Sequence, residues 1–505
     1  MRKTLVINSF SGTVQVLITV VLVLFTIPIF VHQLGTELFG VYSLLLLIGN
    51  LSSLANLGIN ASLIKFISEQ GKSTESDYDI IVSLIILSTI IICLSTLALF
   101  FEKFIMTNVL AIKSEFINNE TIGLYNYLIL SNIIMFIGQI GTAILDALQK
   151  IYLTNLFQLI YSFLYWGLML LALTLFSSLQ YIGLSIILTS LIWFLLVFFS
   201  VKRFWRKLQF KGIKTNFYRV FKKNIGYGIK VYTSSILNFL FEPLSKILLS
   251  NFVGIKEVGL FDIVLRIKTQ AWNILSKLLY PIIPHISKER IFSKIKYFIT
   301  DLEQKIVFII LPLIILIVFG AYPFVKLWIG RDIELISVGI ILLVPAHIAG
   351  LLLFPNYQFL MLKGYPGKTI ILQAINSIVN VVCFFVLLPN YGYYAIILAN
   401  FIAILSSTIV NMYYQKKYLG SFIFKNLQDL FKWIIIVITL SLVGIILTNI
   451  IKTNFSLIFV LVFMTFIVSI LLFRILKVFS AEDINKYIGF NQRLLSIINK
   501  LLITN

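Results

Sequence analysis

The sequence has few charged residues and few cysteines. Only 12% of its 505 residues are charged, whereas 59% are hydrophobic and the mean hydropathy is +1.00. No class of soluble globular protein has this composition, so a polytopic membrane protein is predicted. The two cysteines, Cys93 and Cys383, both lie inside apolar segments. They therefore indicate neither a disulfide framework nor a metal site.

Histidines and nucleotide-binding motifs are also scarce. His32, His285 and His347 lie far apart in the sequence, without metal-ligand spacing and without a cysteine partner. No phosphate-binding loop of the Walker type occurs, so ATP is not expected to drive this protein directly. No segment outside the apolar runs is long enough for a soluble domain, whereas a membrane glycan polymerase or ligase would need a large external loop for its catalytic residues. These absences predict a protein that is not an enzyme and has no cofactor.

Apolar runs of membrane-spanning length dominate the rest of the chain. A spanning helix needs about 20 apolar residues, and fourteen runs meet this requirement. The expected spans lie near residues 11–31, 38–61, 80–101, 124–146, 152–175, 179–200, 231–251, 258–284, 305–325, 335–358, 369–388, 392–414, 433–451 and 455–473.

The basic residues indicate how these spans are oriented. Lysine and arginine number 41 against 20 acidic residues, which gives a net charge of +21. With the N-terminus in the cytoplasm, 31 basic residues fall in cytoplasmic segments and six in external loops. Because basic residues are enriched in cytoplasmic loops, both termini are predicted to be cytoplasmic. The excess of positive charge is then explained by topology and contact with anionic lipid, and no nucleic-acid partner is expected.

A basic segment and an internal repeat divide the chain into halves. Residues 201–230 contain ten basic residues with interleaved aromatic ones, which predicts an interfacial amphipathic helix. The segment GTELFGVYS from Gly35 is echoed by GIKEVGLFD from Gly254, at an offset of 219 residues. Parallel repeats of this kind place a substrate site between the halves. The predicted organisation is an N-terminal lobe over 1–200, a cytoplasmic linker over 201–230, a C-terminal lobe over 231–414, two further spans over 433–476 and a cytoplasmic tail over 477–505.

Charged residues interrupt two expected spans, 231–251 and 258–284. A charge at the centre of a spanning helix costs about 2.5–3.5 kcal/mol on insertion scales, so these residues are predicted to face other helices or a watery cavity. Intramembrane ionisable residues usually mark a transport path. The first span carries Glu242 and Lys246, and the second carries Asp262, Arg266, Lys268 and Lys277.

Helical spacing places most of these residues on one face of each helix. In the second span the polar face comprises Asp262, Arg266, Gln270, Asn273 and Lys277, and in the first it comprises Ser235, Asn238, Glu242 and Lys246. Each set falls within about 80° at 100° per residue, whereas Lys268 points nearly the opposite way. In a structural alternative, acidic and basic residues four positions apart neutralise each other within one helix. The two spans would still carry an excess of two positive charges.

Other polar residues extend this picture. Asp146, Glu242 and Asp262 are candidates for binding a coupling cation, sodium or a proton, because a buried acid is costly unless it is compensated. Amides and hydroxyls in other spans suit a sugar chain, and they equally suit contacts between helices worth about 0.6–2 kcal/mol each. The latter group comprises Asn50, Ser53, Asn60, Gln139, Thr142, Gln373, Asn376 and Asn380.

Several motifs carry a family resemblance. They are a proline at position 28, the pattern LG-x3-FG-x-Y at 34–42, the pattern NLG-x3-S-x2-KF-x2-E at 56–69, VGLFDIVLR at 258–266 and PIIPHIS at 281–287. Together they resemble the polysaccharide flippases of the multidrug/oligosaccharidyl-lipid/polysaccharide (MOP) exporter superfamily. The resemblance covers essentially the whole chain, and the N-terminal block is its most specific part.

This resemblance implies an all-α protein of about fourteen transmembrane helices in the bacterial cytoplasmic (inner) membrane. Two six-helix lobes would be related by a pseudo-twofold axis along the membrane normal, with two C-terminal helices in addition. The implied function is the translocation of polyprenyl-diphosphate-linked oligosaccharide units of O-antigen type by alternating access, for cell-surface polysaccharide biosynthesis. The implied partners are the lipid-linked glycan, membrane lipid, a coupling cation, and polysaccharide polymerase and chain-length machinery.

Carried over by position, the resemblance makes Lys246, Arg266 and Lys277 the cationic cavity residues that bind the diphosphate, and Lys268 is a further candidate for this role. Asn238, Gln270 and Asn273 would be polar cavity residues beside them. Glu242 and Asp262 depart from the pattern because they dilute the positive charge. Two alternatives in the same superfamily stay open, a flippase for the peptidoglycan-precursor lipid and a multidrug/cation antiporter. The antiporter would be expected to have twelve spans and a cavity that favours cations.

Overall fold

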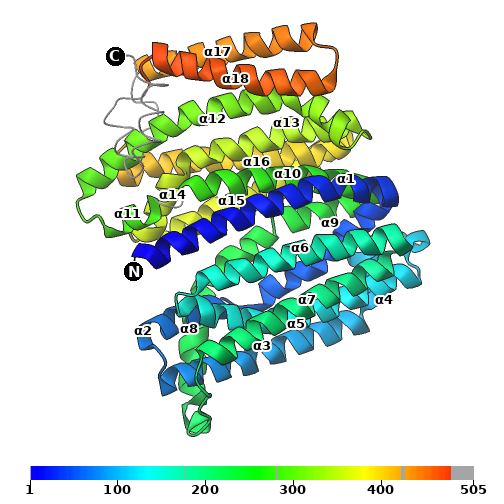
Figure 1. Cartoon of the computed structure of the whole chain (residues 1–505), viewed down its shortest axis with the longest axis vertical. Helices are drawn as coiled ribbons and strands as arrows, with labels where there is room; N and C mark the ends of the chain where they lie inside the picture. Colours follow the sequence, from blue (N-terminus) through cyan, green and yellow to red (C-terminus); the bar gives the residue numbers. More distant parts are fainter. Residues whose placement is uncertain (1, 177, 280–281, 422–426, 479–505) are drawn as a thin grey trace. The chain divides into compact units, whose positions relative to one another are not determined.

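The computed structural model describes residues 2–176, 178–279, 282–421 and 427–478, in which every regular element is a helix. Helices are the expected form because a bilayer offers no water to pair with exposed backbone groups. In chain order they are α1 (Arg2–Ala55), α2 (Ile59–Gln70), α3 (Thr74–Phe100), α4 (Glu102–Phe104), α5 (Asn119–Ala147), α6 (Ile151–Phe176), α7 (Leu179–Phe204), α8 (Ile213–Phe239), α9 (Glu242–Phe252), α10 (Ile255–Leu279), α11 (Ile282–Lys288), α12 (Phe292–Trp328), α13 (Ile333–Gly350), α14 (Phe354–Leu362), α15 (Pro366–Tyr391), α16 (Tyr393–Tyr414), α17 (Leu427–Ile450) and α18 (Asn454–Ile475) (Figure 1).

Eleven of the described helices are long and apolar enough to cross a membrane. One of these, α1, contains two of the expected spans, because Gly35 has a non-helical backbone (φ 76°, ψ 167°) between them. The seventh and eighth expected spans correspond to α8 with α9 and to α10, whose charged residues set them apart from the apolar helices. The all-α, multi-pass fold is confirmed, and the structure agrees with a count of about fourteen spans.

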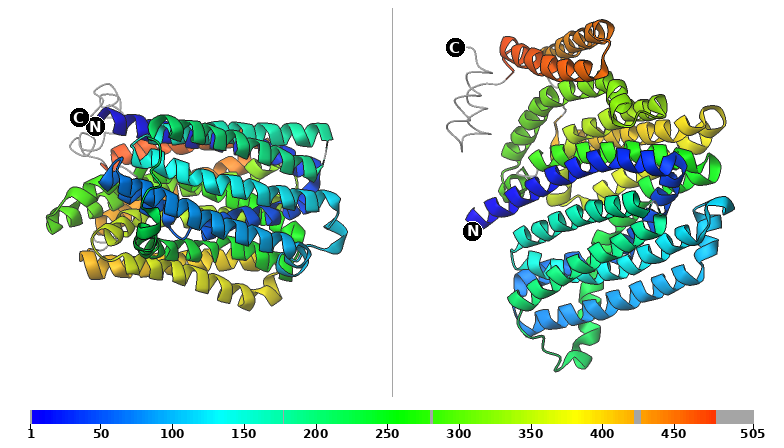
Figure 2. Two further views of the ribbon diagram at one scale, coloured as in Figure 1. Left: turned by 90° about the horizontal axis from the view of Figure 1, so that it is seen from below. Right: turned by 45° about the vertical axis from the view of Figure 1, so that its right-hand side comes forward.

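The chain forms two compact units, Met1–Ile263 and Val264–Asn505. Several long helices run side by side within each unit, α3, α5, α6 and α7 in the first and α12, α13, α15 and α16 in the second (Figures 1 and 2). In the first unit α5 packs along α7, where Gly138 lies directly against the ring of Trp193. In the second unit α12 packs against α17 and α18 through a cluster that includes Phe308, Trp433 and Phe473. The division falls within α10, and the lobe boundaries expected from the sequence stay a prediction.

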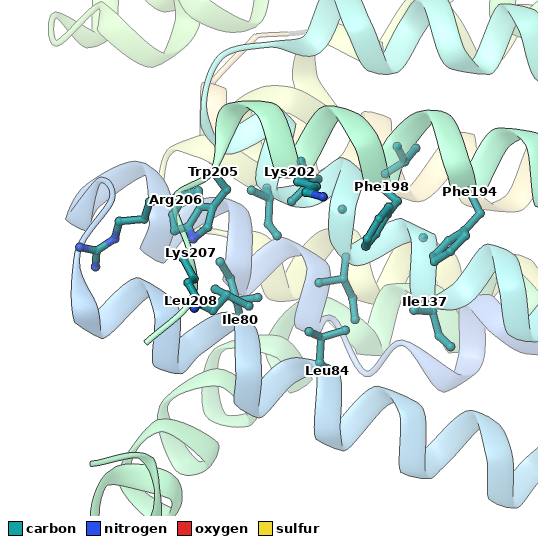
Figure 3. A pocket seen from close by; sticks show the side chains of 16 residues that line it. Ile80, Leu84, Ile137, Phe194, Phe198, Lys202, Trp205, Arg206, Lys207 and Leu208 are labelled. Carbon is teal, nitrogen blue, oxygen red and sulfur yellow. The ribbon is translucent and has the colours of Figure 1, made fainter. Parts of the chain in front are cut away.

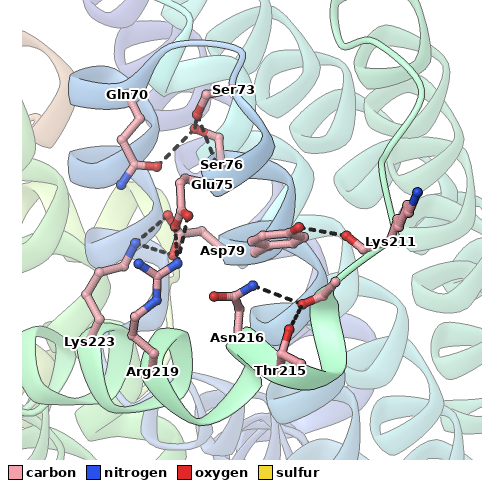
Figure 4. A network of polar contacts seen from close by, with 12 residues as sticks. Gln70, Ser73, Glu75, Ser76, Asp79, Lys211, Thr215, Asn216, Arg219 and Lys223 are labelled. Carbon is pink, nitrogen blue, oxygen red and sulfur yellow. Dashed lines mark hydrogen bonds and ion pairs between the residues drawn. The ribbon is translucent and has the colours of Figure 1, made fainter.

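The segment predicted as a basic linker makes a polar network with the start of α3 (Figure 4). Helix α7 ends at Phe204 and α8 starts at Ile213, so most of residues 201–230 belong to these two helices. Three ion pairs join the segment to α3: Arg206 with Asp77 at 2.8 Å, Arg219 with Glu75 at 2.7 Å and Lys223 with Asp79 at 2.6 Å. Acidic residues are also favourable at this end of α3, because a helix N-terminus carries partial positive charge.

The two repeated sequence segments contact each other inside the first unit. A Cβ atom added to Gly40 would overlap the carbonyl oxygen of Ile255, and one added to Gly259 would lie 2.5 Å from the carbonyl oxygen of Thr36. At the offset of 219 residues, Gly259 is the equivalent of Gly40 and Ile255 is the equivalent of Thr36. Such reciprocal contacts are what a twofold relation produces. The two glycines allow α1 and α10 to cross at backbone contact distance.

Candidate functional site

The helix that carries the first charged face is broken. Residues 231–251 are divided between the end of α8 and α9, with Leu240 and Phe241 between them. Phe241 leaves the helical conformation (φ −96°, ψ −82°), and Pro243 lies in the first turn of α9. The hydroxyl of Ser245 donates to the carbonyl oxygen of Phe241 at 2.7 Å. Broken helices are tolerated at membrane depth only where protein or a cavity covers the backbone, and transporters use them to build substrate and ion sites.

Lys246 lies one turn beyond this break, in a polar contact between three helices. Its ammonium group forms an ion pair with Asp262 of α10 and donates to the hydroxyl of Ser43 in α1 at 3.0 Å. Only 12% of the Lys246 side chain and 5% of the Asp262 side chain are exposed. A buried ion pair requires close geometry and further hydrogen bonds to offset the loss of hydration, and Ser43 supplies one.

The partners of Lys246 occupy equivalent positions in the internal repeat. Ser43 and Asp262 are separated by the same 219 residues that relate the two repeated segments. The cation therefore lies where these segments converge. The sequence identified Lys246 and Asp262 as charged residues inside expected spans. Spacing along a single helix does not indicate that they pair across two helices.

The polar face of α10 continues beyond Asp262. Arg266, Gln270 and Asn273 are half-buried, and Lys277 is exposed in the last turn of the helix. On the first face, Glu242 begins α9 and is half-buried, whereas the side chain of Asn238 lies outside the described residues. The assignment of these residues to one substrate path stays a prediction.

Lys268 has different surroundings from the other cations of α10. Its side chain is 1% exposed, and it lies close enough to His347 of α13 for their charges to interact. The imidazole of His347 also contacts the indole of Trp272, with ring centroids 4.4 Å apart. Lys268 is therefore part of the packed interior of the second unit, a location that its helical position alone does not reveal.

Several of the remaining predicted polar residues make contacts between neighbouring helices. Asp146 accepts a hydrogen bond from Thr154 at 2.8 Å, and the side-chain amide of Asn60 donates to Gln139 at 3.2 Å. In the second unit, Asn400 donates to Asn380 at 2.9 Å. These bonds favour the structural interpretation of Asn60, Gln139 and Asn380, because amides commonly connect helices inside membranes. The side chains of Asn50 and Ser53 lie outside the described residues.

One buried acid was missed by the sequence analysis. Glu303 is fully buried in α12, although the expected ninth span begins two residues later and leaves it in a cytoplasmic segment. The signal that reveals it is a run of buried apolar residues at helical spacing, Ile295, Ile299, Leu302 and Ile306. This run extends the amphipathic helix back to Phe292 and brings Glu303 inside.

A cavity of about 640 Å³ lies elsewhere in the first unit, between α3, α5 and α7. Its walls are mostly apolar, with Ile80, Leu84 and Phe198 among them (Figure 3). Arg206 lies at one end, and Lys202 lies between Trp205 and Phe198. None of the charged residues that the sequence singled out as site candidates lines it. The cavity therefore does not account for the predicted cationic path.

Solved structures similar to this one include a lipid flippase and multidrug transporters. Lipid II flippase MurJ in an inward closed conformation aligns with a TM-score of 0.75 and 16% identity, over 91% of this chain and 97% of that chain. An inward-facing multidrug resistance MATE family transporter of the MOP superfamily aligns with a TM-score of 0.64 and 16% identity, over 79% of this chain and 94% of that chain. The bent form of the Vibrio cholerae MATE transporter VcmN aligns with a TM-score of 0.58 and 13% identity, over 83% of this chain and 98% of that chain. The protein thus has the fold of the MOP superfamily transporters.

The sequence then identifies the family within this class. Residues 5–289 match the family model described as polysaccharide biosynthesis protein, and the chain belongs to this family. A search of curated proteins found no significant match. The resemblance seen in the sequence motifs is thereby confirmed. The family and the structural neighbours are flippases and transporters, and the protein is a multi-pass membrane protein of the same flippase type.

Proposed function

We propose that this protein moves polyprenyl-diphosphate-linked oligosaccharide units from the cytoplasmic to the external leaflet by alternating access, for cell-surface polysaccharide biosynthesis. The observation that carries the proposal is the match of residues 5–289 to the polysaccharide biosynthesis family. The fold supports it, because a solved relative of the same fold is a lipid flippase. In this proposal the protein is a transporter without catalytic residues.

The charged helices supply the chemistry that a diphosphate needs. A diphosphate crossing a bilayer requires cations and hydrogen-bond donors along its path, and charge-assisted hydrogen bonds are the strongest available. We assign Lys246, Arg266 and Lys277 to this role. Lys268, which is buried beside His347, is assigned a positioning role within the second unit.

The ion pair between Lys246 and Asp262 suggests how this path works. A lysine buried without a counter-ion would be costly, so Asp262 compensates its charge when no substrate is bound. In the proposed cycle, the diphosphate replaces Asp262 as the partner of Lys246. The competing carboxylate also weakens the site enough for release, since over-tight binding would slow transport.

A specific observation favours a second candidate substrate. The similarity to lipid II flippase MurJ, at a TM-score of 0.75 over 91% of the chain, fits a flippase for a peptidoglycan-precursor lipid. Both substrates carry a diphosphate on a polyprenyl chain, so the cationic path fits either one. A multidrug/cation antiporter is a less suitable assignment, because cationic substrates would be repelled by the excess of positive charge on α9 and α10.

A flipping assay distinguishes these candidates. The purified protein is reconstituted into liposomes that contain a fluorescent polyprenyl-diphosphate oligosaccharide, fluorescent lipid II or an encapsulated cationic dye. Flipping is measured as fluorescence that becomes accessible to an added quencher, and dye efflux is measured directly. We expect movement of the oligosaccharide lipid at least tenfold above protein-free liposomes. Flipping of lipid II alone would support the second candidate, and dye efflux alone would overturn both.

The proposed orientation places both termini in the cytoplasm of a bacterial inner membrane, where polymerase and chain-length machinery would receive the product outside. Cysteines replacing Ser114 and Asn390 are expected to react with an impermeant maleimide in intact cells, and cysteines replacing Lys72 and Thr215 only after lysis. The background protein lacks Cys93 and Cys383. All four positions are exposed. A reversed pattern at any position would show that the orientation or the span count is wrong.

A further inference from the structure

Glu303 presents a buried carboxyl group without an ion pair among the described residues. It lies in α12 with none of its surface exposed. One carboxylate oxygen accepts a hydrogen bond from the side-chain amide of Gln415, and the backbone N–H of Asn356 also donates to the carboxylate. The other oxygen, Oε1, has no hydrogen-bond partner within the described chain. An ionised carboxylate in such a place requires a compensating positive charge.

The two residues that donate hydrogen bonds to Glu303 also carry buried oxygens without a hydrogen-bond partner. Oε1 of Gln415 and Oδ1 of Asn356 are buried and have no donor within the described residues. The amide nitrogen of Gln415 is already used on Glu303, and that of Asn356 donates to Oδ1 of Asn411 at 2.7 Å. Glu303 and the two residues that donate to it therefore present three unsatisfied oxygens, whereas buried polar atoms are ordinarily paired.

The charge and type of these oxygens select the ligand. Carboxylate and amide oxygens are the ligands of hard cations. A single carboxylate with neutral amides is balanced by one positive charge, which indicates a monovalent ion. Within the described residues, no group of three or more histidine, cysteine or acidic side chains is arranged to hold a metal, so a divalent or transition-metal site is not indicated here. A proton would satisfy only one oxygen, whereas a metal ion binds several oxygen ligands at once.

The backbone around this cluster is also irregular. Gln415 begins a π-helical turn, Gln415–Leu419, that follows α16. Asn356 lies in the first turn of α14, which follows a 3₁₀ turn at Leu351–Leu353. π-turns occur frequently at functional sites, and helix ends offer backbone groups that the helix itself does not use.

We propose that Glu303, Gln415 and Asn356 bind one sodium ion between α12, α14 and the end of α16. This site is separate from Asp146, Glu242 and Asp262, the acids that the sequence offered for cation binding. The binding itself does not rest on the proposed transport function. In the proposed site Glu303 is the charged ligand, and the side-chain amides of Gln415 and Asn356 are the neutral ligands.

Equilibrium binding of radioactive sodium to the purified full-length protein tests the proposal. We expect saturable binding that falls by about one sodium per chain in Glu303→Gln, which preserves the size of the side chain and removes its charge. Asp301→Asn is the matched control, because Asp301 lies on the same helix and has its own partner, Lys305, at 2.7 Å. This control is expected to bind as the wild type does.

Thermal unfolding supplies an independent measurement. Replacing choline by sodium at equal ionic strength is expected to raise the unfolding temperature of the wild type and of Asp301→Asn by a few degrees, since a ligand stabilises the folded state that binds it. Glu303→Gln should show no such rise. Unchanged sodium binding in Glu303→Gln would overturn the proposal. If Glu303→Gln does not fold, sodium binding to the wild-type protein becomes the test. Absence of saturable sodium binding to the wild-type protein would also overturn the proposed site.

Discussion

Replacement of Asp262 by alanine is expected to remove most of the folded protein from the membrane. The variant leaves Lys246 buried without its counter-ion, since only 12% of that side chain is exposed. Breaking a buried ion pair by removing one partner costs about 3–5 kcal/mol, which is a large share of a typical folding free energy of about 5–15 kcal/mol. The measurement is the amount of monodisperse protein recovered by fluorescence-detected size exclusion.

The double variant Lys246→Met with Asp262→Leu is expected to recover normal abundance and yet to flip glycan lipid at least tenfold more slowly. Apolar residues of similar size often replace a buried ion pair without loss of stability. A hydrogen bond to a charged group contributes about 1.5–3 kcal/mol, so its loss from substrate binding accounts for a decrease of this size. If the double variant transports at the wild-type rate, Lys246 serves only to neutralise Asp262.

A matched pair of substitutions controls for the general effect of removing an ion pair. Lys223 and Asp79 form an ion pair at 2.6 Å in the same unit, in the polar network between α8 and α3. The double variant Lys223→Met with Asp79→Leu is expected to retain transport, because this pair lies outside the proposed substrate path. Equal loss of transport in both double variants would show that the assay reports stability alone.

Replacement of Arg266 or Lys277 by alanine is expected to lower transport about tenfold or more at normal abundance. The two cations are separated by eleven residues, or roughly 16 Å along α10. A diphosphate could therefore pass from one to the other without meeting a single deep binding site. Arg266→Lys should recover only part of the activity, because lysine lacks the paired donors that match a phosphate. Initial rates of glycan-lipid flipping measure these effects.

Two other lysines separate a specific effect from a general effect of charge. Lys294 is exposed near the start of α12, and its replacement by alanine is expected to leave both abundance and transport unchanged. Lys268→Met should instead lower abundance, because that side chain is 1% exposed and lies beside His347. Wild-type transport by both Arg266→Ala and Lys277→Ala would contradict the cationic path.

The sequence by itself determined the class of the protein and its helices. The length of the apolar runs decides this, since each run must satisfy its own backbone groups inside a bilayer and therefore forms a helix. The motifs at the N-terminus and at 258–266 were enough to indicate the family. The same local reasoning placed Lys246, Asp262 and Arg266 within membrane-spanning segments, because it requires only their positions within those runs.

Only the tertiary structure decided which of these residues meet. Lys246 contacts Asp262 on the next helix and Ser43 about 200 residues earlier, at a point where two glycines let α1 and α10 cross closely. Periodicity describes the faces of one helix, but the crossing of two helices depends on their packing. Glu303 shows the same limit: its helix extends beyond the apolar run, and its contacts with Gln415 and Asn356 come from elements that are 53 to 112 residues away in the chain.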